Sequence, residues 1–460
     1  MKLKYDVIVI GGTLEGIKGA KYAAKLGARV GLILDVDYNL ESAEKYLFYQ
    51  VQNELLSTAY FHHRRDILAE IKNLITQKYL PELEALEVDI INLPYELTLH
   101  KNRVSLKTNQ DTLTANTYLL ATTFMSSYST IEGMETVGYL TPYDIFQKFD
   151  LSSLPDDIVI IGQDAIALNL ATNLSQAQKK VTLLTEKSSV LPQEEKEIAF
   201  LLQSQLEVLG VKIYTDCNIS QVKIIDNRKW IQAGNKAIDT TEIIITDSCL
   251  SKKIDSHISI LKKIGVNLNQ GKIVVNEKLQ TYHPQIYACG NLLGGYSLAN
   301  VAQLEAEIAL KNALFLPVYS IDYRFIPYTI NTNPIITRIG YTEAQARYVY
   351  DDQISVITIN TDFISYATLE NQIGLIKIIL NHNQEIIGCH IWGNQGHNLL
   401  PILSLFIKQY KTINELLKIN FTDNISQEII EKIKIQWQEM NKKQNQAIID
   451  ILQTWFIWKR

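Results

Sequence analysis

One arrangement of elements occurs twice in this sequence, and it constrains the fold more than any other feature. An apolar strand runs into a glycine turn, then a helix with small residues on one side, then a second apolar strand. The first copy covers residues 6–20 and 29–35, and the second covers 158–171 and 181–186. Strands covered on both faces of a parallel sheet read as such continuous Val, Ile and Leu runs. We therefore predict an α/β protein with two Rossmann-like dinucleotide-binding domains.

The length and the pattern beyond these copies predict further organisation. A chain of 460 residues is too long for a single core and suggests about three domains. The polar stretch 151–157, just before the second copy, is a candidate domain boundary. From about residue 326, strands at 354–359 and 373–380 are followed by helices, as in an α+β domain, and 427–460 has helical periodicity.

Charge and hydropathy exclude several functions. The formal net charge of -5 gives no general basic field, so no nucleic-acid partner is expected, and the basic patch 62–65 is interpreted as a solvated helix face. No stretch reaches the roughly 18 to 20 apolar residues of a transmembrane segment. The apolar run at the N-terminus passes directly into a glycine turn, as a first strand does and a signal peptide does not. A cytoplasmic protein is expected.

The cysteines and histidines lack the spacing of redox or metal motifs. Cys217, Cys249, Cys289 and Cys389 are too far apart for a CxxC or CxxxxC motif, which favours a reducing compartment. The histidines also lack metal-ligand spacing. No metal site is predicted.

The first glycine turn is the candidate cofactor site. A dinucleotide fold prefers G-x-G-x-x-G here, because the tight turn lets the pyrophosphate approach the helix N-terminus. Gly11, Gly12 and Gly16 are present, but Thr13 replaces the middle glycine. The bulk of this side chain weakens the approach of a phosphate, whereas its hydroxyl is able to donate to one. Asp35 ends the second strand and is the candidate acid for the adenosine ribose, with a structural turn residue as the alternative.

Two later segments carry a resemblance to a known family. They are 281–291, which reads TYHPQIYACGN, and 298–314, which begins with Leu298 and Ala299. Here the chain resembles the class I pyridine nucleotide-disulfide oxidoreductases, the family of dihydrolipoamide dehydrogenase, glutathione reductase and mercuric reductase. The resemblance implies that the first segment ends in Gly-Asp, with the aspartate holding the ribityl chain of FAD. This sequence has Gly290 and Asn291, whose amide is still able to hydrogen-bond a ribityl hydroxyl.

The resemblance runs from residue 3 to about 430 and implies a domain plan with FAD as the cofactor. Segments 333–343 and 388–393 resemble the opening and a later strand of the family's dimerisation domain, so a homodimer is implied. The expected parts are an FAD-binding domain at 1–150 and 275–325, an NAD(P)-type domain at 151–274, an α+β dimerisation domain at 326–430 and a helical C-terminal extension at 431–460.

The thiol chemistry of the family has no counterpart in this sequence. Lys45 matches the family's FAD-contacting lysine, and counting back from it places Glu41 where the second cysteine of the C-x-x-x-x-C disulfide would stand. The connection from Asp35 is too short for the rest of that segment. The family's His-Glu base corresponds to Thr422 and Gln427, and neither exchanges a proton near neutral pH. We predict that thiol-disulfide chemistry is lost, and the catalytic residues are unknown.

The second glycine turn is altered as well. Its six positions run from Gly162 to Ala167 and place Asp164 where a phosphate would approach. Two unit charges about 4 Å apart repel by ~4 kcal/mol at an effective dielectric of about 20, roughly a thousandfold in affinity. An aspartate here also caps the helix amides itself. Asn169 replaces a family glutamate and the ribose-side acid is displaced to Glu186, so NAD(P)H binding is expected to be weak or absent.

Two functions stay open at this point. The chain is either an FAD-dependent oxidoreductase that receives electrons from an unidentified donor, or a non-catalytic dimeric scaffold, a pseudoenzyme with a binding or regulatory role. The Trp-rich tail 453–460 either packs against the dimer or contacts a partner or a membrane surface.

Overall fold

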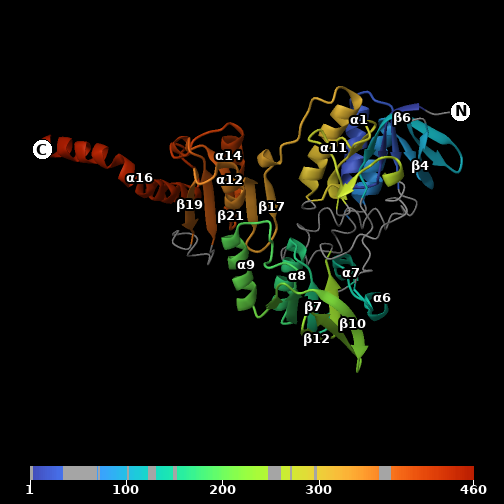
Figure 1. Cartoon of the computed structure of the whole chain (residues 1–460), viewed down its shortest axis with the longest axis horizontal. Helices are drawn as coiled ribbons and strands as arrows, with labels where there is room; N and C mark the ends of the chain where they lie inside the picture. Colours follow the sequence, from blue (N-terminus) through green and yellow to red (C-terminus); the bar gives the residue numbers. More distant parts are fainter. Residues whose placement is uncertain are drawn as a thin grey trace. The chain divides into compact units, whose positions relative to one another are not determined.

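The chain forms two compact units, which are described separately (Figure 1). The first unit comprises Met1–Pro192 and Ala199–Asp322, and the second comprises Gln193–Ile198 and Tyr323–Arg460. The computed structural model describes residues 4–34, 70, 73–100, 103–122, 131–148, 153–246, 261–269, 272–294, 298–361 and 374–459, without the side chains of 4, 75, 76, 148, 442–453 and 456.

The first unit contains a sheet of seven described strands. The pairs β1–β2, β2–β3, β1–β6 and β6–β16 are parallel, whereas β5 pairs antiparallel with both β6 and β4. The order is β3 (Asp89–Ile91), β2 (Val30–Ile33), β1 (Lys4–Ile10), β6 (Thr112–Leu120), β5 (Arg103–Thr108) and β4 (Tyr95–His100), and β16 (Ile286–Ala288) also pairs with β6.

The alternation of side chains along β1 explains why both faces of this sheet are buried. Val7 and Val9 pack on one face, whereas Ile8 and Ile10 pack on the other. Helices α1 (Leu14–Lys25) and α11 (Ala299–Leu314) cover the first face and lie side by side (Figure 1). The turn between β1 and α1 is therefore held at the end of a central strand whose last four residues, 7–10, are buried.

A second parallel sheet follows the same plan. Its described strands are in the order β13 (Glu242–Ile245), β7 (Asp157–Ile161), β8 (Lys180–Leu184) and β9 (Lys212–Tyr214). Helix α8 (Ala165–Gln176) follows β7 directly, and its residues from Ala165 to Leu174 are all buried. An antiparallel sheet of β10 (Ile219–Ile225), β11 (Arg228–Ala233) and β12 (Lys236–Thr240) packs in the same core.

The second unit is an antiparallel sheet with helices. Its described strands are in the order β17 (Tyr328–Ile330), β18 (Ile336–Gly340), β21 (Ile386–Trp392), β20 (Leu375–Leu380) and β19 (Ser355–Asn360). Alternate strand residues such as Ile376 and Ile378 contribute to a core shared with α14 (Gly396–Lys408), α15 (Ile413–Leu416) and α16 (Asn424–Trp458). Helix α12 (Glu343–Tyr350) and the start of α9 (Lys196–Val208) also belong to this unit.

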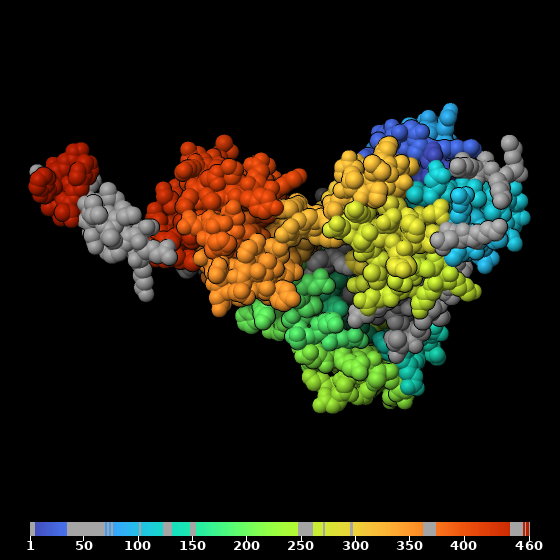
Figure 2. Space-filling view, turned by 45° about the horizontal axis from the view of Figure 1, so that its top comes forward, coloured from blue at the N-terminus to red at the C-terminus, as the bar shows by residue number. Residues whose placement is uncertain are grey.

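Helix α16 has two different environments along its length. Near its start Ile429, Ile433 and Trp437 are buried in the core of the second unit. Its C-terminal end extends away from the other elements of that unit, and Trp455 and Trp458 are 55% and 89% exposed (Figures 1 and 2). Among the residues that the structure describes, no helix is long and apolar enough to cross a membrane.

The predicted fold class is confirmed: two parallel sheets, each with a glycine turn before a helix, precede an α+β domain. The boundaries of the three expected domains stay a prediction. The boundary expected near 151 lies inside the first unit, so the division into compact units does not coincide with it.

Candidate functional site

The first glycine turn joins β1 to α1 and makes close backbone contacts. A Cβ atom on Gly11 would overlap the carbonyl oxygen of Ala121, and one on Gly16 would overlap the carbonyl oxygen of Gly11. Gly11 also has a φ of 131°, a value that residues other than glycine rarely adopt. Ala121 follows the end of β6, so this turn lies against the next strand end. Glycine is therefore required at both of these positions for the turn to form.

Thr13 is committed to the turn itself. It is the N-cap of α1, and its hydroxyl oxygen accepts a hydrogen bond of 3.2 Å from the Gly16 amide. The same hydroxyl donates to the carbonyl oxygen of Ala121 at 2.5 Å. A hydroxyl has one hydrogen, so this hydrogen is directed at Ala121 and not toward a phosphate. The hydroxyl role that the sequence suggested for Thr13 is taken by the protein backbone.

The second predicted segment of the site lies beside this turn. Gly290 follows β16 and donates its amide to Oε2 of Glu305, on α11, at 2.6 Å. Asn291 lies in the same turn, a 3-10 helix over Gly290–Leu292. Leu298 is the N-cap residue of α11 and Ala299 its first residue. A Cβ on Gly290 would overlap Oε1 of Glu15, which connects this segment to the first turn.

Glu15 is the residue between these two turns that the sequence analysis missed. It lies in the first turn of α1, yet only 2% of its surface is exposed. Burial raises its pKa to about 7 although its own amide stabilises the carboxylate, and the nearby Glu305 raises the pKa further. In the sequence Glu15 lies between Gly11 and Gly16, two glycines that pack closely against backbone. This position is the signal from which its burial could have been predicted. The turn thus contains a titratable group near neutral pH.

The second glycine turn, between β7 and α8, is closed by its own aspartate. Asp164 is the N-cap of α8 and accepts a hydrogen bond of 2.9 Å from the Ala167 amide, which confirms the predicted cap. Thr246 also fills the turn, because its hydroxyl would overlap a Cβ on Gly162. Asn169 is buried in α8, and Glu186 is exposed after β8. The amide that a pyrophosphate would approach is therefore already bonded to a carboxylate.

Three sequence-predicted positions lie outside the described residues. They are Asp35, the candidate ribose acid, Lys45, the candidate FAD-contacting lysine, and Glu41, the position of the missing second cysteine.

The counterparts of the family's base have local structural contacts. Gln427 lies in the first turn of α16, where its side-chain oxygen accepts from the Phe421 amide at 3.0 Å and its nitrogen donates to Glu431 at 3.2 Å. Asp423 caps the same helix by accepting from the Ser426 amide. Thr422 precedes this cap. The stretch therefore stabilises a helix start.

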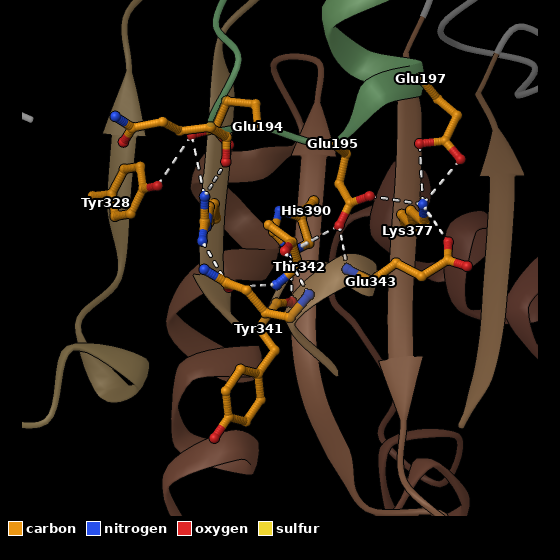
Figure 3. A network of polar contacts seen from close by, with 12 residues as sticks. Glu194, Glu195, Glu197, Tyr328, Tyr341, Thr342, Glu343, Lys377 and His390 are labelled. Carbon is orange, nitrogen blue, oxygen red and sulfur yellow. Dashed lines mark hydrogen bonds and ion pairs between the residues drawn. The ribbon is translucent and has the colours of Figure 1, made fainter. Parts of the chain in front are cut away.

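A row of polar side chains crosses the sheet of the second unit (Figure 3). Tyr328 faces Arg338, Arg338 faces His390, and His390 faces Lys377 on successive strands. Lys377 is only 1% exposed. We call these four residues the polar row. Such a row on a buried sheet face needs partners from elsewhere in the chain.

Carboxylates from Gln193–Ile198 and α12 provide those partners (Figure 3). The Nζ atom of Lys377 lies 2.7 Å from Glu195, 3.0 Å from Glu197 and 2.7 Å from Glu343. Glu194 accepts from Tyr328 at 3.1 Å and pairs with Arg338 at 3.3 Å. Burial lowers the pKa of Lys377, but the hydrogen bonds to the three carboxylates outweigh it and raise the pKa overall. The ammonium is therefore charged.

His390 is the neutral member of the polar row. Burial lowers its pKa to about 4, and the neighbouring Arg338 adds to this effect. Its Nε2 lies 2.8 Å from the carbonyl oxygen of Tyr341, to which the neutral ring donates. His390 is therefore neutral and buried, and its ring supports the sheet. Among the described residues, no group of three His, Cys, Asp or Glu side chains is placed to hold a metal ion.

Two parallel sheets, each with a glycine turn between its first strand and a helix, define a protein with two dinucleotide-binding folds. Comparison with known families gives the particular class. The family model of the pyridine nucleotide-disulphide oxidoreductases matches residues 5–306, and that of their dimerisation domain matches 326–425. The chain belongs to the class I pyridine nucleotide-disulfide oxidoreductases, a family of FAD-binding oxidoreductases.

Individual relatives agree with this family. A mercuric reductase of Staphylococcus aureus is 27% identical over 75% of this chain and 63% of its own length. A dihydrolipoyl dehydrogenase of Bacillus subtilis is 32% identical over 45% of each chain. This chain thus spans less than two thirds of either relative. The solved structure of the flavoprotein disulfide reductase RclA from Escherichia coli has a TM-score of 0.75 at 21% identity, covering 93% of this chain and 98% of that one, which shows a shared fold.

Proposed function

We propose that this protein is an FAD-binding flavoprotein oxidoreductase that works without the thiol-disulfide chemistry of its family. The observation that supports FAD binding is the first glycine turn, between β1 and α1, in which a Cβ atom on Gly11 or Gly16 would overlap backbone atoms. FAD, when bound, supplies the electron-accepting ring system. The residues that would hold it are Gly11, Gly12, Thr13 and Gly16 at the pyrophosphate, Asp35 and Lys45, Gly290 and Asn291 at the ribityl chain, and the Leu298–Ala299 turn.

The absence of a reactive thiol pair is supported by the described cysteines. Cys217, Cys289 and Cys389 are free and buried. Burial raises the pKa of each of the three thiols. The thiolate is the form that attacks a disulfide, and a buried thiol with a raised pKa is unreactive. The four cysteines of the sequence are also far apart along the chain.

The proposed electron donor is not a nicotinamide nucleotide. The Asp164 carboxylate holds the Ala167 amide at 2.9 Å and brings a negative charge to the turn where a pyrophosphate would lie. The occupied amide and the negative charge both oppose the binding of NADH and NADPH. Electrons would then reach the flavin from another reductant.

The second candidate is a non-catalytic homodimeric scaffold. It is favoured by one specific observation: the N-termini of α1 and α8 are both capped by side chains of their own turns, Thr13 and Asp164. In either case we infer a cytoplasmic homodimer that pairs through residues 326–425. Contact of the exposed Trp455 and Trp458 with a partner or a membrane surface stays a prediction.

An absorbance spectrum of the purified full-length protein, before and after incubation with FAD, tests the proposal. We expect a bound-flavin spectrum that dithionite bleaches under anaerobic conditions and that NADH and NADPH leave unchanged for many minutes. A protein that stays colourless after incubation with FAD would refute the flavoprotein proposal and support the scaffold. Rapid bleaching by NADH or NADPH would refute the proposed exclusion of nicotinamide nucleotides.

A further inference from the structure

The buried carboxyl group of Glu15 lies inside the proposed FAD site. It is in the first turn of α1, where the pyrophosphate of a bound dinucleotide approaches the helix amides. Acidic residues in a first helical turn are usually solvated, whereas Glu15 is 2% exposed. One side of its carboxyl lies against Gly290, in the segment proposed for the ribityl chain. It therefore lies between the two halves of the proposed site.

The contacts of Glu15 place it in competition with a phosphate. Its carboxylate accepts a hydrogen bond from its own backbone amide, at the N-terminus of α1. Thr13 in turn accepts from the Gly16 amide at 3.2 Å. Side-chain oxygen atoms of Thr13 and Glu15 thus already accept hydrogen bonds from amides in the first turn of α1. A phosphate that arrives here meets a negative charge where a positive end of a helix dipole should attract it.

The titratable neighbours do not neutralise this charge. Glu305, on α11, lies near Glu15, and its Oε2 atom accepts a hydrogen bond of 2.6 Å from the Gly290 amide. It therefore adds a second carboxyl group to the same buried region. Cys289, at the end of β16, has a pKa raised well above its ordinary value by burial and by these two carboxyl groups, and is an uncharged thiol. Protonation of Glu15 is the change that removes the charge.

We infer that FAD binds to the form of the protein in which Glu15 is protonated, so that Glu15 is a positioning residue that makes flavin occupancy depend on pH. This inference rests on the proposed function and deepens it. A protonated carboxyl group no longer repels the pyrophosphate, and it holds the helix amides less strongly than a carboxylate does. FAD binding should therefore be coupled to uptake of one proton.

The expected size of the effect follows from linkage. The pKa of Glu15 is about 7 before FAD binds. The negative pyrophosphate raises it further in the complex, so affinity is highest below pH 7 and falls as pH rises through this value. With a pKa of about 7, about nine tenths of the groups are protonated at pH 6 and about one tenth at pH 8. The Kd for FAD should rise about tenfold between these pH values.

The test is a titration of the full-length apoprotein with FAD at pH 6 and pH 8, at constant ionic strength, followed by quenching of flavin fluorescence. For the wild type we expect the tenfold rise in Kd. The variant E15Q imitates the protonated side chain, so its Kd should change less than twofold and match the wild-type value at pH 6. The control E307Q removes a partly exposed carboxylate one turn from Gln303 on α11, and it should keep the wild-type pH dependence.

The possible results of this titration distinguish the role of Glu15 from FAD binding itself. A wild-type Kd that is the same at both pH values overturns the role of Glu15 and leaves FAD binding in place. An E15Q variant that keeps the tenfold dependence overturns it as well, and circular dichroism shows whether that variant is folded. The wild-type measurement does not depend on any variant. Failure of both proteins to bind FAD at either pH overturns the proposed function together with this inference.

Discussion

Replacement of Lys377 by methionine should destabilise the second unit strongly. The methionine fills much of the same volume but leaves three carboxylates without their common ammonium group. They do not contribute equally. Glu197 is 50% exposed and is able to recover hydration, and Glu343 keeps its ion pair with Arg347 at 2.7 Å. Glu195 is 5% exposed and loses its only close ammonium partner among the described contacts.

The expected loss of unfolding free energy follows from the different exposure of the three carboxylates. Removal of one partner of a buried ion pair costs about 3–5 kcal/mol, because the other charge stays buried. Only Glu195 meets that condition, so we expect about 3–5 kcal/mol from one carboxylate and not a multiple of it. The control Lys411→Met removes a half-exposed lysine whose i,i+4 pair with Glu415 has a length of 2.8 Å. Salt bridges between exposed side chains contribute about 0–1 kcal/mol.

Urea denaturation followed by tryptophan fluorescence provides the assay, because Trp392 and Trp437 are buried in the second unit. The double variant Glu195→Gln with Lys377→Met should lose less stability than the sum of the single variants, since the neutral amide needs no counter-charge. A loss below 1 kcal/mol for Lys377→Met, or equal losses for Lys377→Met and Lys411→Met, would refute the argument that burial makes this cation essential.

Three further changes test the turns. Asp164→Ala should raise NADH affinity, by at most roughly a thousandfold, as measured by nicotinamide fluorescence; unchanged affinity would show that Asp164 is not the obstacle. Gly11→Ala should abolish FAD binding in a flavin titration, whereas Gly27→Ala, also at positive φ but with open space around it, should not; equal effects would contradict the close-approach argument. Thr13→Ala should lower the unfolding free energy by about 1 kcal/mol in urea, and an unchanged value would show that the cap contributes little.

Local patterns were enough to predict the elements of this fold. The runs around Val7 and Val159 are short, apolar and followed by glycine, and each became a buried parallel strand before a helix. The Asp164 cap could also be predicted, because capping depends on a residue and an amide three positions later. Such features involve neighbours in the chain, whose geometry the backbone of a strand-turn-helix unit already restricts.

The roles of individual side chains in the candidate site could be predicted only in part. Gly11 and Gly16 were predicted as part of a tight glycine turn from their spacing, but their contacts with Ala121 and with each other needed the folded chain. The Thr13 hydroxyl was expected to be able to donate to a phosphate, whereas it donates to Ala121 and accepts from Gly16. The carbonyl of Ala121 is 108 residues away from Thr13, so no local pattern could reveal it.

The two dinucleotide-binding folds and the wide separation of the cysteines could be read from residue types and short spacings alone. Tertiary structure alone decided that Glu15 is buried against Gly290, and that Lys377 meets Glu195 across 182 positions of the chain. The physical reason is that burial and charge pairing are set by what packs against a side chain. A glutamate has the same chemistry everywhere in a sequence, and only its surroundings change its pKa and its role.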